Sequence, residues 1–166
     1  LTVPGARANA VVWQEAEGVI WLFGGMGLGS TSATLGNLND LWKYEAISNQ
    51  WTWMKGSVNA DALGSYGPLQ NFAANNMPGA RSFACSWTAS DGGLWLFGGN
   101  GKASTATVGN LNDLWKFDPL TNNWTWMKGS NGSGAIAGVY GTQGIGATAN
   151  TPGSRYGGVT WVDASG

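Results

Sequence analysis

Short apolar or alternating segments of this chain are separated by short polar segments, a pattern that predicts short β-strands. Residues 51–54 read Trp-Thr-Trp-Met, which places the two tryptophans on one face of a strand and the threonine and methionine on the other. Residues 19–25 (VIWLFGG) are apolar up to a closing pair of glycines, as in a strand buried on both faces. No window of useful length carries apolar residues at i, i+3 and i+4, so we predict no helix.

The same pattern gives four strands in each of two units. The first strand begins at an arginine, the second ends in Gly-Gly, the third contains Asn-Asp-Leu-Trp-Lys, and the fourth begins with tryptophan. The predicted strands are 7–13, 19–25, 39–45 and 51–55 in the first unit, and 81–87, 94–99, 112–118 and 124–128 in the second. Four short antiparallel strands with glycine and aromatic residues at fixed places are typical of a propeller blade.

An internal repeat underlies these two units. The octapeptide GNLNDLWK occurs at 36–43 and again at 109–116. Pro-Gly-Ala-Arg at 4–7 recurs at 78–81, and as Pro-Gly-Ser-Arg at 152–155, with a step of 74 residues. We therefore divide the chain into a first unit (1–77), a second unit (78–151) and the first strand of a third, incomplete one (152–166). Repeat units of this size bury their apolar faces against neighbours, so we interpret the chain as part of a longer array.

Composition narrows the class of protein. The chain has 28 Gly and 11 Trp, and only 10% of its residues are charged, against about 25% in an average domain. A net charge of −1 argues against nucleic acid as a partner. No apolar run reaches the roughly 18–20 residues of a membrane span. The single cysteine, Cys85, excludes an internal disulfide and aligns with Val11 and Val159, which predicts a small packed side chain.

The recurring sequence features of each unit together resemble the kelch repeat. An arginine-led strand, an apolar strand ending in Gly-Gly, an aromatic third strand (NDLWKFD) and a tryptophan opening the fourth are similar to the galactose oxidase central domain type and to bacterial extracellular kelch proteins. The resemblance implies an all-β fold, a β-propeller of four-stranded antiparallel blades, and a secreted or cell-surface location. The step of 74 residues departs from the kelch period of about 50.

The additional residues lie in two long connections of each unit, which we expect at one end of the sheets. Because antiparallel strands alternate in direction, the second-to-third and fourth-to-first connections share an end, where binding usually occurs. These segments are 26–38, 58–78, 100–111 and 131–152. Asp61 and Lys102 have no counterpart in the other unit, which makes them candidates for this face. The full set of possible ligand-face residues is Asp61, Tyr66, Lys102, Tyr140, Trp53 and Trp126.

Residues that recur in every unit are expected to serve the fold, because a unique site needs unique residues. We expect the glycine pairs to give positive φ or a close backbone approach. Each arginine is expected to form a hydrogen-bond network with the Asn-Asp aspartate of the same or the next unit, although these aspartates could instead bond local backbone N–H groups. This recurring set is Arg7, Arg81, Arg155, Gly24, Gly25, Gly98, Gly99, Asp40, Asp113, Trp51 and Trp124.

Candidate chemistry is sparse. The chain has no histidine, so neither a Ser-His-Asp arrangement nor the histidine–copper site of the galactose oxidases has matching positions. We expect no catalytic residue, cofactor or metal site in this segment. The favoured function is a non-catalytic scaffold that presents its loops to a protein or glycan. The alternative is the non-catalytic portion of a carbohydrate-active enzyme, resembling galactose oxidase or a sugar isomerase, with its active site elsewhere.

The remaining partners are further blades. Two blades cannot close a ring of about four to eight, so the others would come from the same longer chain or from other copies.

Overall fold

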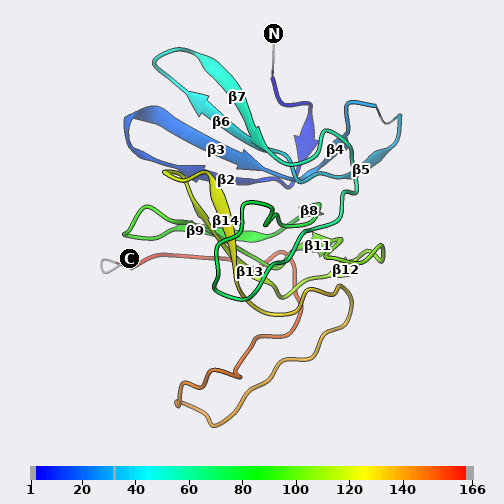
Figure 1. The fold of residues 1–166 in the computed structure, drawn as a ribbon, viewed down its shortest axis with the longest axis vertical. Coiled ribbons are helices and arrows are strands. Elements are labelled where there is room, and N and C mark those ends of the chain that lie inside the picture. Colours follow the sequence, from blue (N-terminus) through cyan, green and yellow to red (C-terminus); the bar gives the residue numbers. More distant parts are fainter. Residues whose placement is uncertain (1–2, 32, 164–166) are drawn as a thin grey trace.

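Figure 1 shows the computed structural model of the chain, which describes residues 3–31 and 33–163. The fold is all-β, and its main elements are two four-stranded antiparallel sheets, one from each repeat unit. In the first sheet the order is β2 (Val11–Gln14), β3 (Val19–Phe23), β6 (Leu41–Glu45) and β7 (Gln50–Lys55). In the second it is β9 (Cys85–Thr88), β10 (Leu94–Phe97), β13 (Leu114–Asp118) and β14 (Asn123–Lys128).

Two smaller sheets extend these strands beyond the glycine pairs. The sequence predicts simple loops at 26–38 and 100–111, whereas the structure forms a short hairpin in each. The first of these three-stranded sheets consists of β1 (Arg7–Ala8), β4 (Met26–Leu28) and β5 (Leu35–Asn37). The second consists of β8 (Arg81–Ser82), β11 (Asn100–Gly101) and β12 (Gly109–Asn110).

One short 3-10 turn, η1 (Ala16–Gly18), joins β2 to β3. None of the described residues belongs to a helix long and apolar enough to cross a membrane.

All eight strands predicted for the two full units are present, but the third unit differs. The segment predicted as its first strand, 155–161, forms no strand and has only an isolated bridge between Leu111 and Arg155. The reason is that no second strand of that unit lies beside it among the described residues. Residues 1–2 and 32 of the first predicted unit, and 164–166 of the third, lie outside the described residues.

The glycine pairs adopt the conformation that the sequence predicts. Gly24 and Gly25 have φ of +66° and +92°, and Gly98 and Gly99 have φ of +64° and +100°. A Cβ on Gly24 would lie 2.7 Å from the carbonyl oxygen of Arg81, and Gly25 donates its backbone N–H to that same oxygen at 2.9 Å. The glycines therefore let the first strand of the second unit dock on the backbone of the first unit.

Gly24→Ala is expected to lower the free energy of unfolding by about 1–3 kcal/mol, because alanine at positive φ is strained and its Cβ meets backbone. Gly146→Ala is the matched control: a Cβ at Gly146 meets nothing within 4 Å. That control is expected to change stability by roughly 0.5 kcal/mol or less. Urea denaturation measures both variants, and equal losses would contradict the close-approach role of Gly24.

The two sheets pack against each other through non-equivalent faces. We call the face that carries Val11, Trp13, Trp21 and Phe23 the front face of the first sheet; all four side chains are buried. It packs on the back face of the second sheet, which consists of Leu94, Leu96, Trp115, Phe117 and Trp124. The ring of Trp21 lies 5.1 Å from that of Phe117, and the Trp13 indole N–H donates to the carbonyl of Trp95 at 3.0 Å. The core is therefore the joint between the units.

Equivalent residues of the two units have unequal environments as a result. Trp124 is completely buried on the back face of the second sheet, whereas its counterpart Trp51 is only half-buried on the back face of the first. On the front face of the second sheet, Trp87 and Trp95 stack on each other and are half-buried. Among the described residues, no further sheet covers either of these two outer faces.

Candidate functional site

The long connections of each unit lie together, as the alternation of strand direction predicts. In the first unit Ser30 donates its backbone N–H to Val58 at 2.7 Å, and in the second Ser104 donates to Asn131 at 2.9 Å. In Figure 1 the tight turns that join β2 to β3 and β6 to β7 lie on the left, and β4, β5, β11 and β12 lie on the right. We call the end formed by 26–38, 58–78, 100–111 and 131–152 the loop face.

Asp61 and Lys102, the two candidates without a repeat counterpart, meet across the units. The Asp61 carboxylate lies 3.7 Å from the Lys102 ammonium, and it also accepts the backbone N–H of Asn37 at 3.0 Å. Both side chains remain partly exposed, so the ion pair contributes about 0–1 kcal/mol. These two residues thus link the loops of neighbouring units on the loop face.

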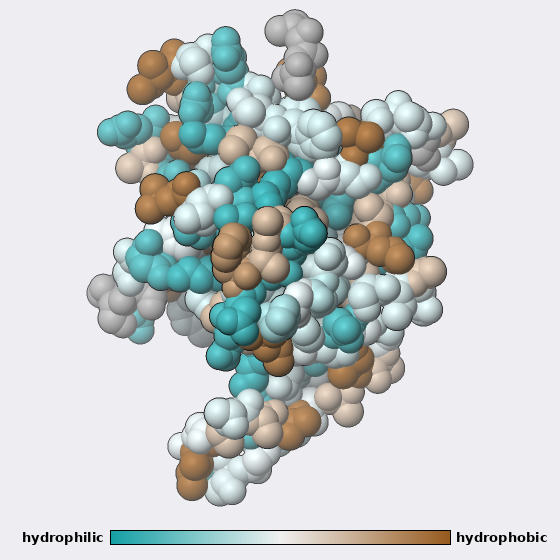
Figure 2. All heavy atoms as spheres, viewed as in Figure 1, coloured by the Kyte–Doolittle hydropathy of each residue, from teal (hydrophilic) through white to brown (hydrophobic). Residues whose placement is uncertain are grey.

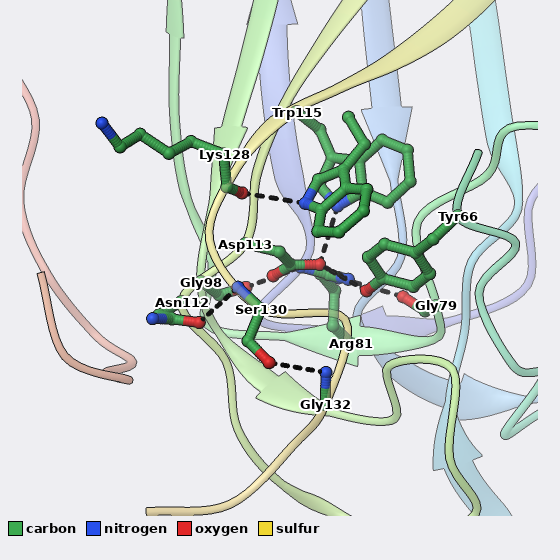
Figure 3. A network of polar contacts seen from close by, with 11 residues as sticks. Tyr66, Gly79, Arg81, Gly98, Asn112, Asp113, Trp115, Lys128, Ser130 and Gly132 are labelled. Atoms are coloured by element: carbon green, nitrogen blue, oxygen red, sulfur yellow. Dashed lines mark hydrogen bonds and ion pairs between the residues drawn. The ribbon is translucent and has the colours of Figure 1, made fainter. Parts of the chain in front are cut away.

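Tyr66 belongs to a long loop of the first unit, but its side chain packs against residues of the second unit. Its hydroxyl donates to the Asp113 carboxylate at 2.6 Å, and its ring contacts those of Trp115 and Trp126 at 4.8 and 5.1 Å. The loop of the first unit thus inserts this side chain into the second unit (Figure 3). The hydroxyl and the ring of Tyr66 are therefore both engaged in packing between the units, while the side chain is half-buried; its assignment to the ligand face stays a prediction.

The centre of this network is a completely buried ion pair between recurring residues. Arg81 donates from both terminal nitrogens to the two oxygens of Asp113, each at 2.7 Å, as a bidentate pair (Figure 3). The same guanidinium also donates to the carbonyls of Gly79 and Gly98 at 3.0 Å. The Trp115 indole N–H is a further donor to Asp113 at 2.7 Å. The expected pairing of arginine with the aspartate of its own unit is therefore present.

The protonation states within the network follow from its surroundings. Burial raises the pKa of the Tyr66 phenol, and the negative charge of Asp113 raises it further. Burial alone would raise the pKa of Asp113, but the charge of Arg81 and the donated hydrogen bonds outweigh it and hold that pKa below the ordinary value. Near neutral pH the Asp113 carboxylate is therefore ionised. The Tyr66 phenol stays protonated and donates a hydrogen bond to it.

The first unit repeats this arrangement without the tyrosine. Arg7 donates to the two oxygens of Asp40 at 2.6 and 2.8 Å, and the Trp42 indole N–H donates to Asp40 at 2.6 Å. In the third segment Arg155 is exposed, and within the described part of the chain its guanidinium donates only to the carbonyl of Gly153. The arginine is thus buried only where the remaining strands of its own unit supply the aspartate.

The other predicted ligand-face residues differ in exposure. Tyr140, the counterpart of Tyr66, is 79% exposed, and Trp53 is 44% exposed. Trp126 is half-buried under Tyr66 and donates its indole N–H to the carbonyl of Lys128 at 2.9 Å. Of the aromatic candidates, Tyr140 and Trp53 therefore remain accessible.

Sequence reasoning missed the role of the tyrosine as a link between units, although a signal for it was present. Tyr66 and Tyr140 are one repeat step apart, each within a Gly-x-Tyr-Gly segment. The rule that recurring residues serve the fold, applied to them as it was to the tryptophans, would have placed them in the packing between units.

Tyr66→Phe is expected to lower the free energy of unfolding by about 1.5–3 kcal/mol, since it removes a hydrogen bond to a buried ionised carboxylate. Tyr140→Phe makes the same chemical change at an exposed position and is expected to cost about 0.5 kcal/mol or less. Chemical denaturation of both variants gives the difference. Equal effects would show that the Tyr66 hydroxyl contributes nothing to the joint.

Metal and thiol chemistry have few candidates here. Within residues 3–31 and 33–163, no three His, Cys, Asp or Glu side chains gather where they could hold a metal ion. Cys85 is a free, half-buried thiol on the front face of the second sheet, at the position that Val11 occupies in the first.

Comparison with known proteins adds one structural likeness. No known protein family matches the chain, and no curated protein does. Among solved structures, that of YjhT is similar to it, with 20% sequence identity and a TM-score of 0.49 over 80% of this chain. The chain spans 40% of the length of that structure.

Proposed function

We propose that this chain forms two neighbouring blades of a kelch-type β-propeller, a non-catalytic scaffold whose loop face binds a protein or a glycan. The observation that carries the proposal is the front-to-back packing of the two sheets. Because the front face of one unit fits the back face of the next, the same contact can be repeated indefinitely in one direction. Four-stranded antiparallel sheets that follow one another in this way are typical of the blades of a propeller, which supports the proposal.

The loop face supports the binding part of the proposal. The long segments of both units are joined there by backbone hydrogen bonds and by the pair of Asp61 and Lys102, so the scaffold holds them in a defined arrangement. Leu35 and Val108, which are repeat counterparts in these segments, are 69% and 51% exposed. Over the whole side of the molecule seen in Figure 2, apolar side chains lie singly or in small groups between polar ones.

Electron microscopy of the native protein tests the architecture. The proposal expects a ring of about four to eight sheets around a central axis, with the sheets stacked front to back. A particle in which the two sheets stand alone, or an open helical stack, would contradict the propeller.

A glycan array and a protein-capture screen test the binding role. If the loop face binds, the double variant Leu35→Ser and Val108→Ser is expected to weaken the signal at least tenfold. The matched control is Ile47→Ser with Leu120→Ser, two exposed counterparts in the tight turns at the other end of the sheets. Loss of binding in the control but not in the loop variant would place the ligand elsewhere.

A further inference from the structure

A cavity beside the Arg7–Asp40 pair has the walls of a tyrosine site but holds no tyrosine from the described residues. Its volume is about 460 Å³, within the usual range of ligand sites. Its polar wall is formed by Arg7 and Asp40, and its aromatic wall by Trp42 and Trp53. Leu28 and Val58 complete the apolar lining.

The second unit shows what such walls hold. There Asp113 accepts hydrogen bonds from Arg81, from the Trp115 indole and from the Tyr66 hydroxyl. In the first unit Asp40 accepts the matching bonds from Arg7 and Trp42, at 2.8 and 2.6 Å on the same oxygen, Oδ2. Among the hydrogen bonds of the described residues, the two aspartates differ by a single donor, the phenol.

The aspartate and the tryptophan of the first unit are more exposed than their counterparts in the second unit, where a phenol covers them. The side chain of Asp113 is completely buried, while that of Asp40 is 11% exposed. Trp126 is half-buried beneath the ring of Tyr66, whereas its counterpart Trp53 is exposed. The first unit therefore has a carboxylate group and an indole face, both accessible from the cavity.

We infer that this cavity binds the side chain of a tyrosine carried on a Gly-x-Tyr-Gly loop of another repeat unit. The phenol donates a hydrogen bond to Oδ2 of Asp40, and its ring contacts Trp42 and Trp53 as the ring of Tyr66 contacts Trp115 and Trp126. The inference rests on the matched geometry of the two units and does not depend on what the loop face binds.

The form of the partner loop also comes from the structure. Tyr66 belongs to a loop closed by a bridge between Ser65 and Met77, and Tyr140 to one closed by a bridge between Val139 and Thr151. Gly64 of the first unit, two residues before Tyr66, donates its backbone N–H to the carbonyl of Ala103 in the second unit at 2.8 Å. A closed loop with a glycine two residues before its tyrosine is therefore the ligand, rather than free tyrosine.

A cyclic peptide with the sequence of residues 138–153 is a suitable probe, because the backbones of Gly138 and Gly153 are adjacent in the structure. The peptide is titrated into the ¹⁵N-labelled protein while the indole N–H resonances of Trp42 and Trp53 are followed. Saturable shifts of both resonances are expected. The same peptide with Tyr140→Phe is expected to bind at least tenfold more weakly, since it lacks the hydroxyl that donates a hydrogen bond to the Asp40 carboxyl group.

Protein variants supply the matched control. Trp53→Ala removes one wall of the cavity and is expected to weaken peptide binding at least tenfold, with the rest of the spectrum unchanged. Trp161→Ala removes an 83% exposed tryptophan of the third segment and is expected to leave binding unchanged. Absence of saturable shifts in the folded protein, equal binding of the two peptides, or full binding to Trp53→Ala would each overturn the inference.

Discussion

Arg81→Ala is expected to lower the free energy of unfolding by about 3–5 kcal/mol, because it leaves the Asp113 carboxylate buried without its counter-charge. Asp113 is completely buried, so water cannot replace the lost donors. The carbonyls of Gly79 and Gly98 also lose their guanidinium partner. Folded domains are stable by only about 5–15 kcal/mol, so this one change removes a large share of that margin. Urea denaturation followed by circular dichroism measures the loss.

Arg155→Ala is the matched control, because the same residue type occupies the same place in the repeat. Arg155 is exposed and has no carboxylate partner among the described residues. We expect a change of about 0.5 kcal/mol or less. Similar losses in the two variants would mean that the recurring arginine acts through its contacts with the preceding backbone and not through the aspartate.

Trp124→Ala is expected to cost about 3–5 kcal/mol, because it empties the centre of the joint between the two sheets. The Trp124 ring lies 6.4 Å from that of Trp13 and 5.4 Å from that of Phe23, both on the opposing sheet, and 5.1 Å from Phe117 on its own. Its removal leaves a cavity that rigid strands on both sides fill only in part. Calorimetry or urea denaturation measures the loss, and both sheets are expected to unfold together at the lower midpoint.

Trp51→Ala tests whether this effect comes from the joint or from the sheet alone. Trp51 is the second residue of β7 as Trp124 is of β14, but its ring contact is with Tyr44 of its own sheet. We expect it to cost less than half as much as Trp124→Ala. Equal costs would show that each sheet is stable by itself and that the packing between the units contributes little.

Because strand formation and glycine conformation depend on nearby residues, the strands of the two large sheets and the positive φ of the glycine pairs could be predicted from the sequence. The alternation at 51–54 and the apolar run at 19–25 each correspond to a strand, because side-chain period and backbone geometry are coupled within a few residues. The Gly-Gly pairs adopt positive φ as predicted, since other residues are strained there. The short hairpins beyond the glycines were missed, because glycine-rich polar segments carry no clear period.

The partners of individual side chains were harder to predict. The pairing of Arg7 and Arg81 with the aspartate of their own unit was one of three possibilities. The partner could also have been the aspartate of the next unit, or the aspartate could have bonded nearby backbone. The position of Tyr66 in the second unit was missed altogether, because the contact joins residues 47 positions apart and belongs to two different units. Such contacts depend on how whole sheets pack.

The sequence by itself determined the strands of the two four-stranded sheets, their order in each unit, the positions of the glycine pairs and the two ends of the sheets. Those features depend on interactions within one unit, which near-identical segments share. Only the tertiary structure decided which copy of each residue is packed between the units: Trp124 and Arg81 are buried while Trp51 and Arg155 are not, and Tyr66 is half-buried in a network while Tyr140 is exposed. The physical reason is that burial depends on the neighbouring unit, and equivalent residues of the two units have different neighbours.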